Sequence, residues 1–258
     1  MDYFTKRDWI EIFESCGIRR GYRVLLQIDC DHLRETAGGV QTILEALMEV
    51  VTSSGTIIIP AFSLSALDPA CREKIPCSYE KWVEYRRSLY GFEKELTESS
   101  LPSMILQRIQ GTLRTDHPVR SFVVWGSCNQ EWVKQPLDFP VSFGHVFSVF
   151  EEGMSCNVLI GVPWEESLLV LAMAHLTELE LVGIQKAWLH RPKRNLAKTF
   201  LVGIPDPAAY DEIRELLHTE EVQTVAGMVE VLSLYSSPNK TKEIWLNSRN
   251  SEHKGSCL

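Results

Sequence analysis

Long apolar runs are missing from this 258-residue chain, and no stretch approaches the ~18–20 consecutive apolar residues of a membrane-spanning helix. The amino-terminal stretch MDYFTKRDWIEIFES is amphipathic and lacks the apolar run of a secretory signal. Positive charge is also scarce: 26 Lys and Arg face 34 Asp and Glu, a net charge of −8 at pH 7. This balance disfavours a nucleic-acid binder held by phosphate contacts and suits neutral or cationic partners. We expect a cytoplasmic protein without a membrane or nucleic-acid partner.

The usual metal-binding patterns are absent as well. Seven cysteines are scattered without a CxxC pair, and seven histidines form no HxxxH or HExxH motif. An odd, dispersed cysteine count in a chain without a signal predicts reduced thiols. We therefore expect no metal cofactor.

Short apolar runs alternate with amphipathic stretches along the chain. RVLLQID (23–29) and TIIIPAF (56–62) have the length of buried strands, and between them Gly38-Gly39 opens a stretch with helical spacing. Such a β-loop-α-β unit usually places its two strands side by side and parallel. Further strands are expected at 121–126, 156–162 and 199–204, and helices at 101–110, 145–152 and 167–180. The alternation predicts a three-layer α/β fold with a mostly parallel central sheet flanked by helices.

No shift in composition marks a domain boundary. We expect one domain over 1–246, followed by a frayed tail at 247–258. Residues 63–100 are polar and form a long excursion between core elements, which is typical of a lid or a substrate loop. The basic stretch 186–198 is expected to be a solvated face.

Three constellations could carry chemistry. The first is a polar loop between the first strand and the glycine-opened helix, where open α/β sheets bind ligands and a helix start suits an anion. Its candidate residues are Asp29, Cys30, Asp31, His32, Gly38 and Gly39. The alternative is a loop whose glycines only make a turn.

The second constellation, RTDHPVRSF, holds Arg114, His117 and Arg120 ahead of a strand. Exposed arginines and a structural histidine would explain it equally well. The third places His175 and Glu178 three residues apart on one face of an apolar helix. A carboxylate one turn away can orient an imidazole for general base catalysis, although a satisfied core histidine is the alternative.

Taken in order, these pieces resemble the aminoglycoside 3-N-acetyltransferase (antibiotic N-acetyltransferase) family over roughly residues 5–180. The resemblance rests on the shared order and spacing of several segments. They are VLLQIDCDHLRETAGGVQTILEALMEVVTSSGTIIIPAFS, RTDHPVRSFVVWG, SFGHVFSVFEEGMSCNVLIGV and AMAHLTE. The family pattern has GG-x-Q-T opening a helix, then R-S-x-H-P-x-x-S, and finally T-x-x-H-x-x-E.

The resemblance implies an enzyme that transfers the acetyl group of acetyl-CoA to an amine. His175 and Glu178 match the pair in the family's last motif, and His175 would take the proton of the amine. The loop 29–32, Gly38 and Gly39 fall where the family holds the cofactor, and Arg114, His117 and Ser121 match the middle motif. Carboxylates of the excursion could attract a cationic acceptor, and we assign Asp68, Glu80 and Glu84 to that role.

The chain departs from the family pattern at several positions. Ile28, Asp29 and Cys30 stand where the family has H-S-S, Ala172 replaces the threonine before His175, and 144–148 lacks the usual G-x-G-S-P. An alternative is thus a catalytically impaired member that serves as a binding or accessory protein. Another is an enzyme for a biosynthetic amine rather than an antibiotic. The sequence leaves a homodimer open.

Overall fold

The computed structural model describes residues 3–30, 36–71, 77–127, 130–143, 145–151, 154–177, 181–204, 206–216, 222–225 and 229–234. Its helices are α1 (Lys6–Ser15), α2 (Gly39–Val51), α3 (Trp82–Ser88), α4 (Leu101–Gln107), α5 (Leu168–Thr177) and α6 (Pro207–Leu216). Its strands are β1 (Arg23–Ile28), β2 (Thr56–Phe62), β3 (Leu113–Arg114), β4 (Arg120–Gly126), β5 (Ser155–Ile160), β6 (Leu181–Leu189), β7 (Leu196–Ile204), β8 (Val222–Val225) and β9 (Val229–Leu234).

The main sheet has the strand order β3-β4-β2-β1-β5-β9-β8. At its centre β1 pairs in parallel with both β2 and β5, so that Leu25 lies opposite Ile58 on one side and Asn157 on the other. The outer pairs are antiparallel, with β4 and β9 running against the other described strands of this sheet. The expected α/β fold with a mostly parallel central sheet is confirmed, with the parallel pairs at the centre and antiparallel outer pairs that make the sheet mixed.

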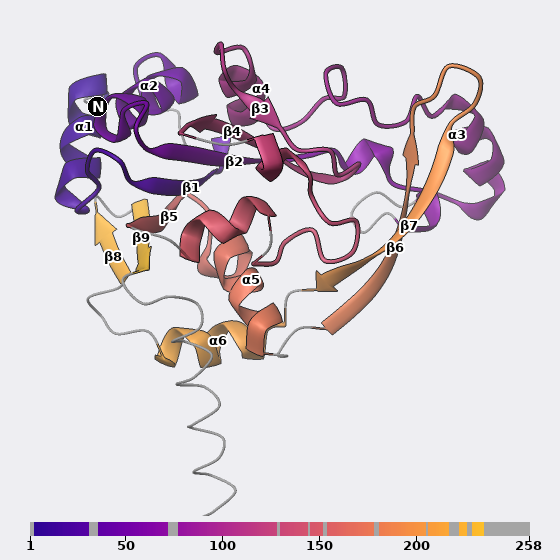
Figure 1. Cartoon of the computed structure of the whole chain (residues 1–258). Helices are drawn as coiled ribbons and strands as arrows, with labels where there is room; N and C mark the ends of the chain where they lie inside the picture. Colours follow the sequence, from indigo (N-terminus) through magenta and orange to yellow (C-terminus); the bar gives the residue numbers. More distant parts are fainter. Residues whose placement is uncertain are drawn as a thin grey trace, which may run out of the picture.

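Helices cover both faces of this sheet, which gives three layers (Figure 1). On one face α1, α2 and α4 pack against alternate strand residues such as Val24 and Leu26. On the other face α5, α6 and the 3₁₀ turn at His145–Glu151 pack against Leu25 and its neighbours. Because successive strand residues point to opposite faces, the continuous apolar run of β1 fills both core layers.

A second, two-stranded sheet forms the antiparallel hairpin β6–β7 beside the segment that joins β2 to β4. We call the hairpin, the turn Pro69–Cys71 and α3 the outer lobe, which lies at the right of Figure 1. Backbone hydrogen bonds join the segment between β2 and β4 to the hairpin, from Asp68 N to Lys186 O (2.8 Å) and from Phe92 N to Trp188 O (2.6 Å). The described part of the 63–100 excursion is therefore integrated into the fold.

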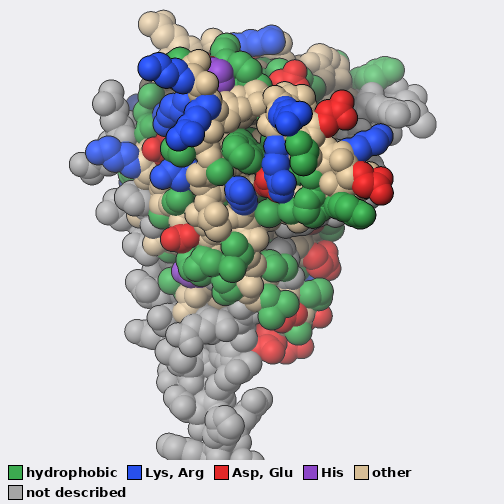
Figure 2. Space-filling view, turned by 90° about the vertical axis from the view of Figure 1, so that its right-hand side faces the viewer, with side chains coloured by type: hydrophobic (Ala, Val, Ile, Leu, Met, Phe, Trp, Pro, Cys, Tyr) green, Lys and Arg blue, Asp and Glu red, His purple; other side chains and the backbone are tan. Residues whose placement is uncertain are grey.

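The basic stretch at 186–198 lies on this hairpin. Arg191, Lys193, Arg194 and Lys198 are exposed, in line with a solvated face. Figure 2 looks onto this end of the molecule and shows Lys and Arg side chains gathered over its upper half.

Candidate functional site

A cleft of about 270 Å³ opens at the carboxyl ends of β1 and β2. This is the edge at which open α/β sheets bind their ligands. The walls are mostly apolar, with a few polar groups. The lining residues are Gln27, Ile28, Ile59, Pro60, Phe62, Ser100, Pro102, Val162, Glu166 and Leu168.

The start of α2 lies one loop beyond β1. Gly38 and Gly39 have φ values of 81° and 63°, in the left-handed region that favours glycine. Gly38 is the N-cap and supplies no capping side chain. Gly39 N donates to Thr36 O (3.0 Å), and the N–H groups that follow it in the first turn receive no cap from Gly38, so they suit an anion. The segment before them is held in place, because Ala37 N donates to Phe4 O (2.9 Å) and Trp9 Nε1 to Thr36 Oγ1 (3.2 Å).

Of the predicted loop residues, Asp29 and Cys30 are half-buried directly after β1, and Asp29 N donates to Ile160 O (2.9 Å). They therefore lie at the same sheet edge as the cleft. Asp31 and His32 lie outside the described residues.

A buried polar network fixes the start of α5. The Ser167 hydroxyl donates to Asn157 Oδ1 (2.7 Å) and accepts from Val170 N (3.2 Å). Gln27 Oε1 accepts from Leu168 N (2.9 Å), which ties the helix to β1. These residues were not singled out from the sequence, although a glutamine and an asparagine inside otherwise apolar strands were the available signal.

The predicted base His175 lies in the last turn of α5. Its half-buried ring is 4.8 Å from the ring of Phe139, between centroids. Leu168, which lines the cleft, is seven residues earlier, and at ~1.5 Å of rise per residue this corresponds to roughly 10 Å along the helix. Glu178, its predicted partner, lies outside the described residues.

Arg114 and Ser121 are buried beside the end of β2. All five N–H donors of Arg114 are used: its partners are Ser121 Oγ, Lys94 O, Thr97 O, Ala61 O and Ser63 Oγ, at 2.7–3.1 Å. Burial lowers the pKa of Arg114 to about 10, so the guanidinium stays charged at neutral pH. The two residues thus clamp the excursion to the sheet, and no donor of Arg114 is left for a cofactor phosphate.

His117 is also buried and fully engaged. Its Nδ1 accepts from Val119 N (3.1 Å) and Arg120 N (2.9 Å), which places the proton on Nε2, 3.1 Å from Leu137 O. Burial lowers the pKa of His117 to about 4. The ring is therefore neutral at physiological pH and holds the turn ahead of β4.

The three predicted acceptor carboxylates have different surroundings. Asp68 is buried, and Arg86 donates to both of its oxygens at 2.8 Å while Trp188 Nε1 donates to Oδ2 (3.1 Å). These contacts lower the pKa of Asp68 to about 2. Glu80 and Glu84 are exposed on or next to α3, at the far end of the molecule from α5 (Figure 1). The structure does not bring the three together around the cleft.

The described part of the chain contains neither a membrane-spanning helix nor a metal-binding cluster. None of the helices there is both long and apolar enough to cross a membrane. No group of three or more His, Cys, Asp or Glu side chains there is arranged to hold a metal ion.

A family model described as aminoglycoside 3-N-acetyltransferase matches residues 25–225 of the chain. The chain belongs to the aminoglycoside 3-N-acetyltransferase family. Among curated proteins it is 29% identical over 140 residues to the SPbeta prophage-derived aminoglycoside N(3')-acetyltransferase-like protein YokD of Bacillus subtilis (strain 168). This match spans about half of each protein, 52% of the chain and 52% of YokD.

Solved structures of the aminoglycoside 3-N-acetyltransferase group share the fold. The crystal structure of YokD has a TM-score of 0.81 at 20% identity and covers 97% of this chain and 96% of its own. AAC-IIIb in a binary complex with CoASH has a TM-score of 0.75 at 16% identity, covering 97% and 98%. AAC-VIa bound to sisomicin has a TM-score of 0.69 at 15% identity, covering 97% and 98%. The chain therefore shares the fold of these structures.

Proposed function

We propose that this protein is a CoA-dependent N-acyltransferase that moves the acetyl group of acetyl-CoA onto a small primary amine. The observation that carries the proposal is the family match over residues 25–225, which includes the cleft and the start of α2. The CoASH complex of AAC-IIIb, which has the same fold, supports the choice of co-substrate.

The described residues fit a CoA thioester in two respects. The first turn of α2 has N–H groups after Gly39 that could bind an anion such as a pyrophosphate, and among the described residues no heavy atom lies within 4 Å of a Cβ added at Gly39. The cleft beside it has the mostly apolar walls, with the polar groups of Gln27 and Ser100, that suit a pantetheine arm. The thioester supplies an activated acyl carbon. The chain's own task is to align the amine with that carbon and to accept its proton.

For the proton acceptor we retain His175, with Glu178 orienting it. The support is the match to the last family motif, and the half-buried position of His175 leaves part of the residue accessible. Removing a positioned general base typically lowers the rate by ~10²–10⁴-fold. We expect His175→Ala to lose transfer by this factor while CoA binding is kept, and Glu178→Gln to lose less.

The first experiment is an acyl-transfer screen that detects the free thiol of released CoA, with acetyl-CoA and a panel of amines. We expect thiol release that depends on the amine. Thermal unfolding with added CoA provides a second readout, because a ligand of the native state raises apparent stability. If CoA neither stabilises the protein at millimolar concentration nor is cleaved in the presence of any amine, the proposal is wrong.

One observation favours a second candidate function, a binding or accessory protein that retains the fold. Among the described residues that line the cleft, none is a histidine or a cysteine, and His175 lies about two helical turns from Leu168. This candidate predicts stabilisation by CoA without thiol release for any amine.

A further inference from the structure

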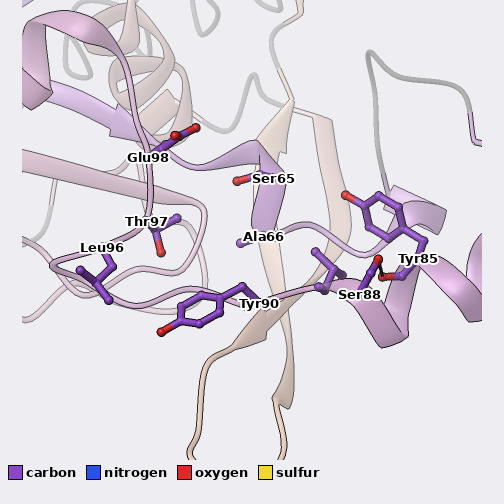
Figure 3. Close-up of a pocket in the computed structure, with 10 residues that line it drawn as sticks. Ser65, Ala66, Tyr85, Ser88, Tyr90, Leu96, Thr97 and Glu98 are labelled. Carbon is purple, nitrogen blue, oxygen red and sulfur yellow. Dashed lines mark hydrogen bonds between the residues drawn. The ribbon is translucent and has the colours of Figure 1, made fainter.

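A second hollow, of about 390 Å³, lies between the chain that follows β2 and the segment 85–98 (Figure 3). Figure 3 shows Ser65 and Glu98 on its upper side, Tyr85 and Ser88 to the right, Tyr90 below and Thr97 to the left. Leu89, Gly91, Leu96 and Ala66 complete the lining. We call this hollow the hydroxyl groove, because five of its ten lining residues, Ser65, Tyr85, Ser88, Tyr90 and Thr97, carry a hydroxyl group.

The charge that lines the hydroxyl groove is negative and comes from Glu98. Glu98 is the one charged residue among those that line it, and within the described part of the chain no cation forms an ion pair with its exposed carboxylate. A phosphate-rich ligand would therefore be repelled here, whereas an ammonium group would gain a charge-assisted hydrogen bond. This chemistry separates the groove from the uncapped start of α2, which suits an anion.

Tyr90 forms a rigid floor for the groove. Its ring stacks on His190 at 4.1 Å between centroids and 8° between planes, and its hydroxyl donates to Glu93 Oε2 (2.5 Å). With its ring and its hydroxyl held in this way, Tyr90 offers a preorganised surface at low entropic cost to a ring-shaped ligand. The ring is still 52% exposed, so a ligand can reach it.

The hydroxyl groove and the cleft have no lining residue in common, but one segment contributes residues to both. The Ser63 hydroxyl donates to Glu98 O (3.0 Å), and the Ser100 hydroxyl donates to Pro60 O (2.9 Å). These bonds join β2 and the residue after it to the segment 96–102, which contributes Thr97 and Glu98 to the groove and Ser100 and Pro102 to the cleft. The segment 96–102 therefore separates a ligand in the groove from the cleft at the sheet edge.

We propose that the hydroxyl groove binds the acceptor, and that Glu98 selects a small hydroxylated molecule through one ammonium group. The inference rests on the proposed function, because it assigns the acceptor half of that reaction. It replaces the carboxylates predicted from sequence with a different one: Asp68 is neutralised by Arg86, and Glu80 and Glu84 do not line the groove. One carboxylate matches one cation, which favours a mono-amine over a polycation.

Equilibrium binding without CoA tests the groove separately from catalysis. Glucosamine and glucose are titrated, at a pH where the amine is protonated, into the full-length protein and followed by NMR chemical shifts. Glu98→Gln is compared with Glu215→Gln, which makes the same charge change at an exposed site on α6. Since one charge-assisted hydrogen bond is at stake, we expect Glu98→Gln to weaken glucosamine binding about tenfold. Glucose binding should not change, and Glu215→Gln should behave as the wild type with both sugars.

The proposal is overturned if the wild type fails to prefer glucosamine over glucose, or if Glu98→Gln leaves that preference intact. A fall caused equally by Glu215→Gln would also overturn it, because the effect would then be one of net charge. The two proposals fail in different ways. Glucosamine binding that depends on Glu98 but without thiol release counts against the enzyme alone. Acyl transfer whose amine KM is unchanged in Glu98→Gln counts against the groove alone.

Discussion

Asp68 is a carboxylate that the sequence predicts to be free for a ligand, but in the structure it is buried and bonded to other residues. Its side chain is 1% exposed and receives both donors of the Arg86 fork. Removing one partner of a buried ion pair leaves the other partner's charge uncompensated, which is costly. Here the cost is reduced because the remaining partner, Arg86, is 33% exposed and its guanidinium can be hydrated. We expect Asp68→Asn to lower the free energy of unfolding by about 2–3 kcal/mol in urea titrations. Glu11→Gln, in the exposed pair with Arg7, should change it little.

The same residue gives a prediction for acid. The pKa of Asp68 is about 2 in the folded state against an ordinary 3.8, so the folded state favours the charged form. Its stabilisation is present above about pH 4 and is lost as the pH falls toward 2. Unfolding curves across this range should show a steeper acid loss for the wild type than for Asp68→Asn. Equal slopes would mean that the Arg86 contact is not made in solution.

His117 responds to pH in a different window. Its folded pKa of about 4 lies below the ordinary 6.5, so the neutral ring is favoured and the unfolded chain binds the proton first. Stability is then complete above about pH 6.5 and falls by up to about 3 kcal/mol as the pH approaches 4. NMR of the folded protein should show a ring that is still neutral near pH 5, with the proton on Nε2. A His117 ring that titrates near 6.5 would contradict the buried, doubly accepting geometry.

At the scale of elements, the start of α2 offers a matched pair of glycine variants. Gly39 and Gly111 both have positive φ (63° and 85°), and at either position an added Cβ meets no heavy atom of the described residues within 4 Å. Alanine should therefore cost a similar ~1–2 kcal/mol of backbone strain at both. If CoA approaches the first turn of α2, Gly39→Ala alone should reduce the thermal stabilisation by CoA. An equal reduction in Gly111→Ala would show that the effect comes from strain.

The elements that the sequence predicts well are those with one dominant periodicity. The strand at 56–62 and the helix after Gly38 lie as expected, because buried strands and amphipathic helices have distinct apolar spacing. The hairpin β6–β7 was not predicted as such. Its basic tip was interpreted as a solvated stretch, and several of its apolar residues, such as Ile184, are exposed, so the period-2 pattern is weak. The hairpin also pairs with residues more than a hundred positions earlier, as Ala187 does with Leu67, and such long-range pairing leaves no pattern in the local sequence.

At the scale of the whole molecule, the candidate site was harder to predict than the fold. The family resemblance suggests Arg114 and His117 as cofactor-binding residues, and the charge of the excursion suggests Asp68 as an acceptor-binding one. The structure shows that each has its polar atoms engaged by partners from other segments. Arg114, for example, donates to the carbonyl oxygen of Ala61, which is 53 residues earlier in the sequence. Conversely, Glu98 drew no attention in the sequence, because its exposure in a hollow depends on how the excursion folds against β2. A pattern of residues indicates chemistry, and only the fold decides which groups remain available.

The last prediction concerns which amines this molecule accepts. A net charge of −8 attracts cations in general, and relatives with this fold bind drugs such as sisomicin. In the hydroxyl groove, however, the described lining residues present one carboxylate, whereas a kanamycin- or gentamicin-type substrate brings several ammonium groups that each need a partner once desolvated. The altered family positions at 28–30 and 146–148 point the same way. We therefore expect such drugs to be poor substrates, with kcat/KM below about 10⁴ M⁻¹s⁻¹, and small mono-amines to be better. Steady-state kinetics with both classes decide the matter, and efficient acetylation of the drugs would instead make this protein a resistance enzyme.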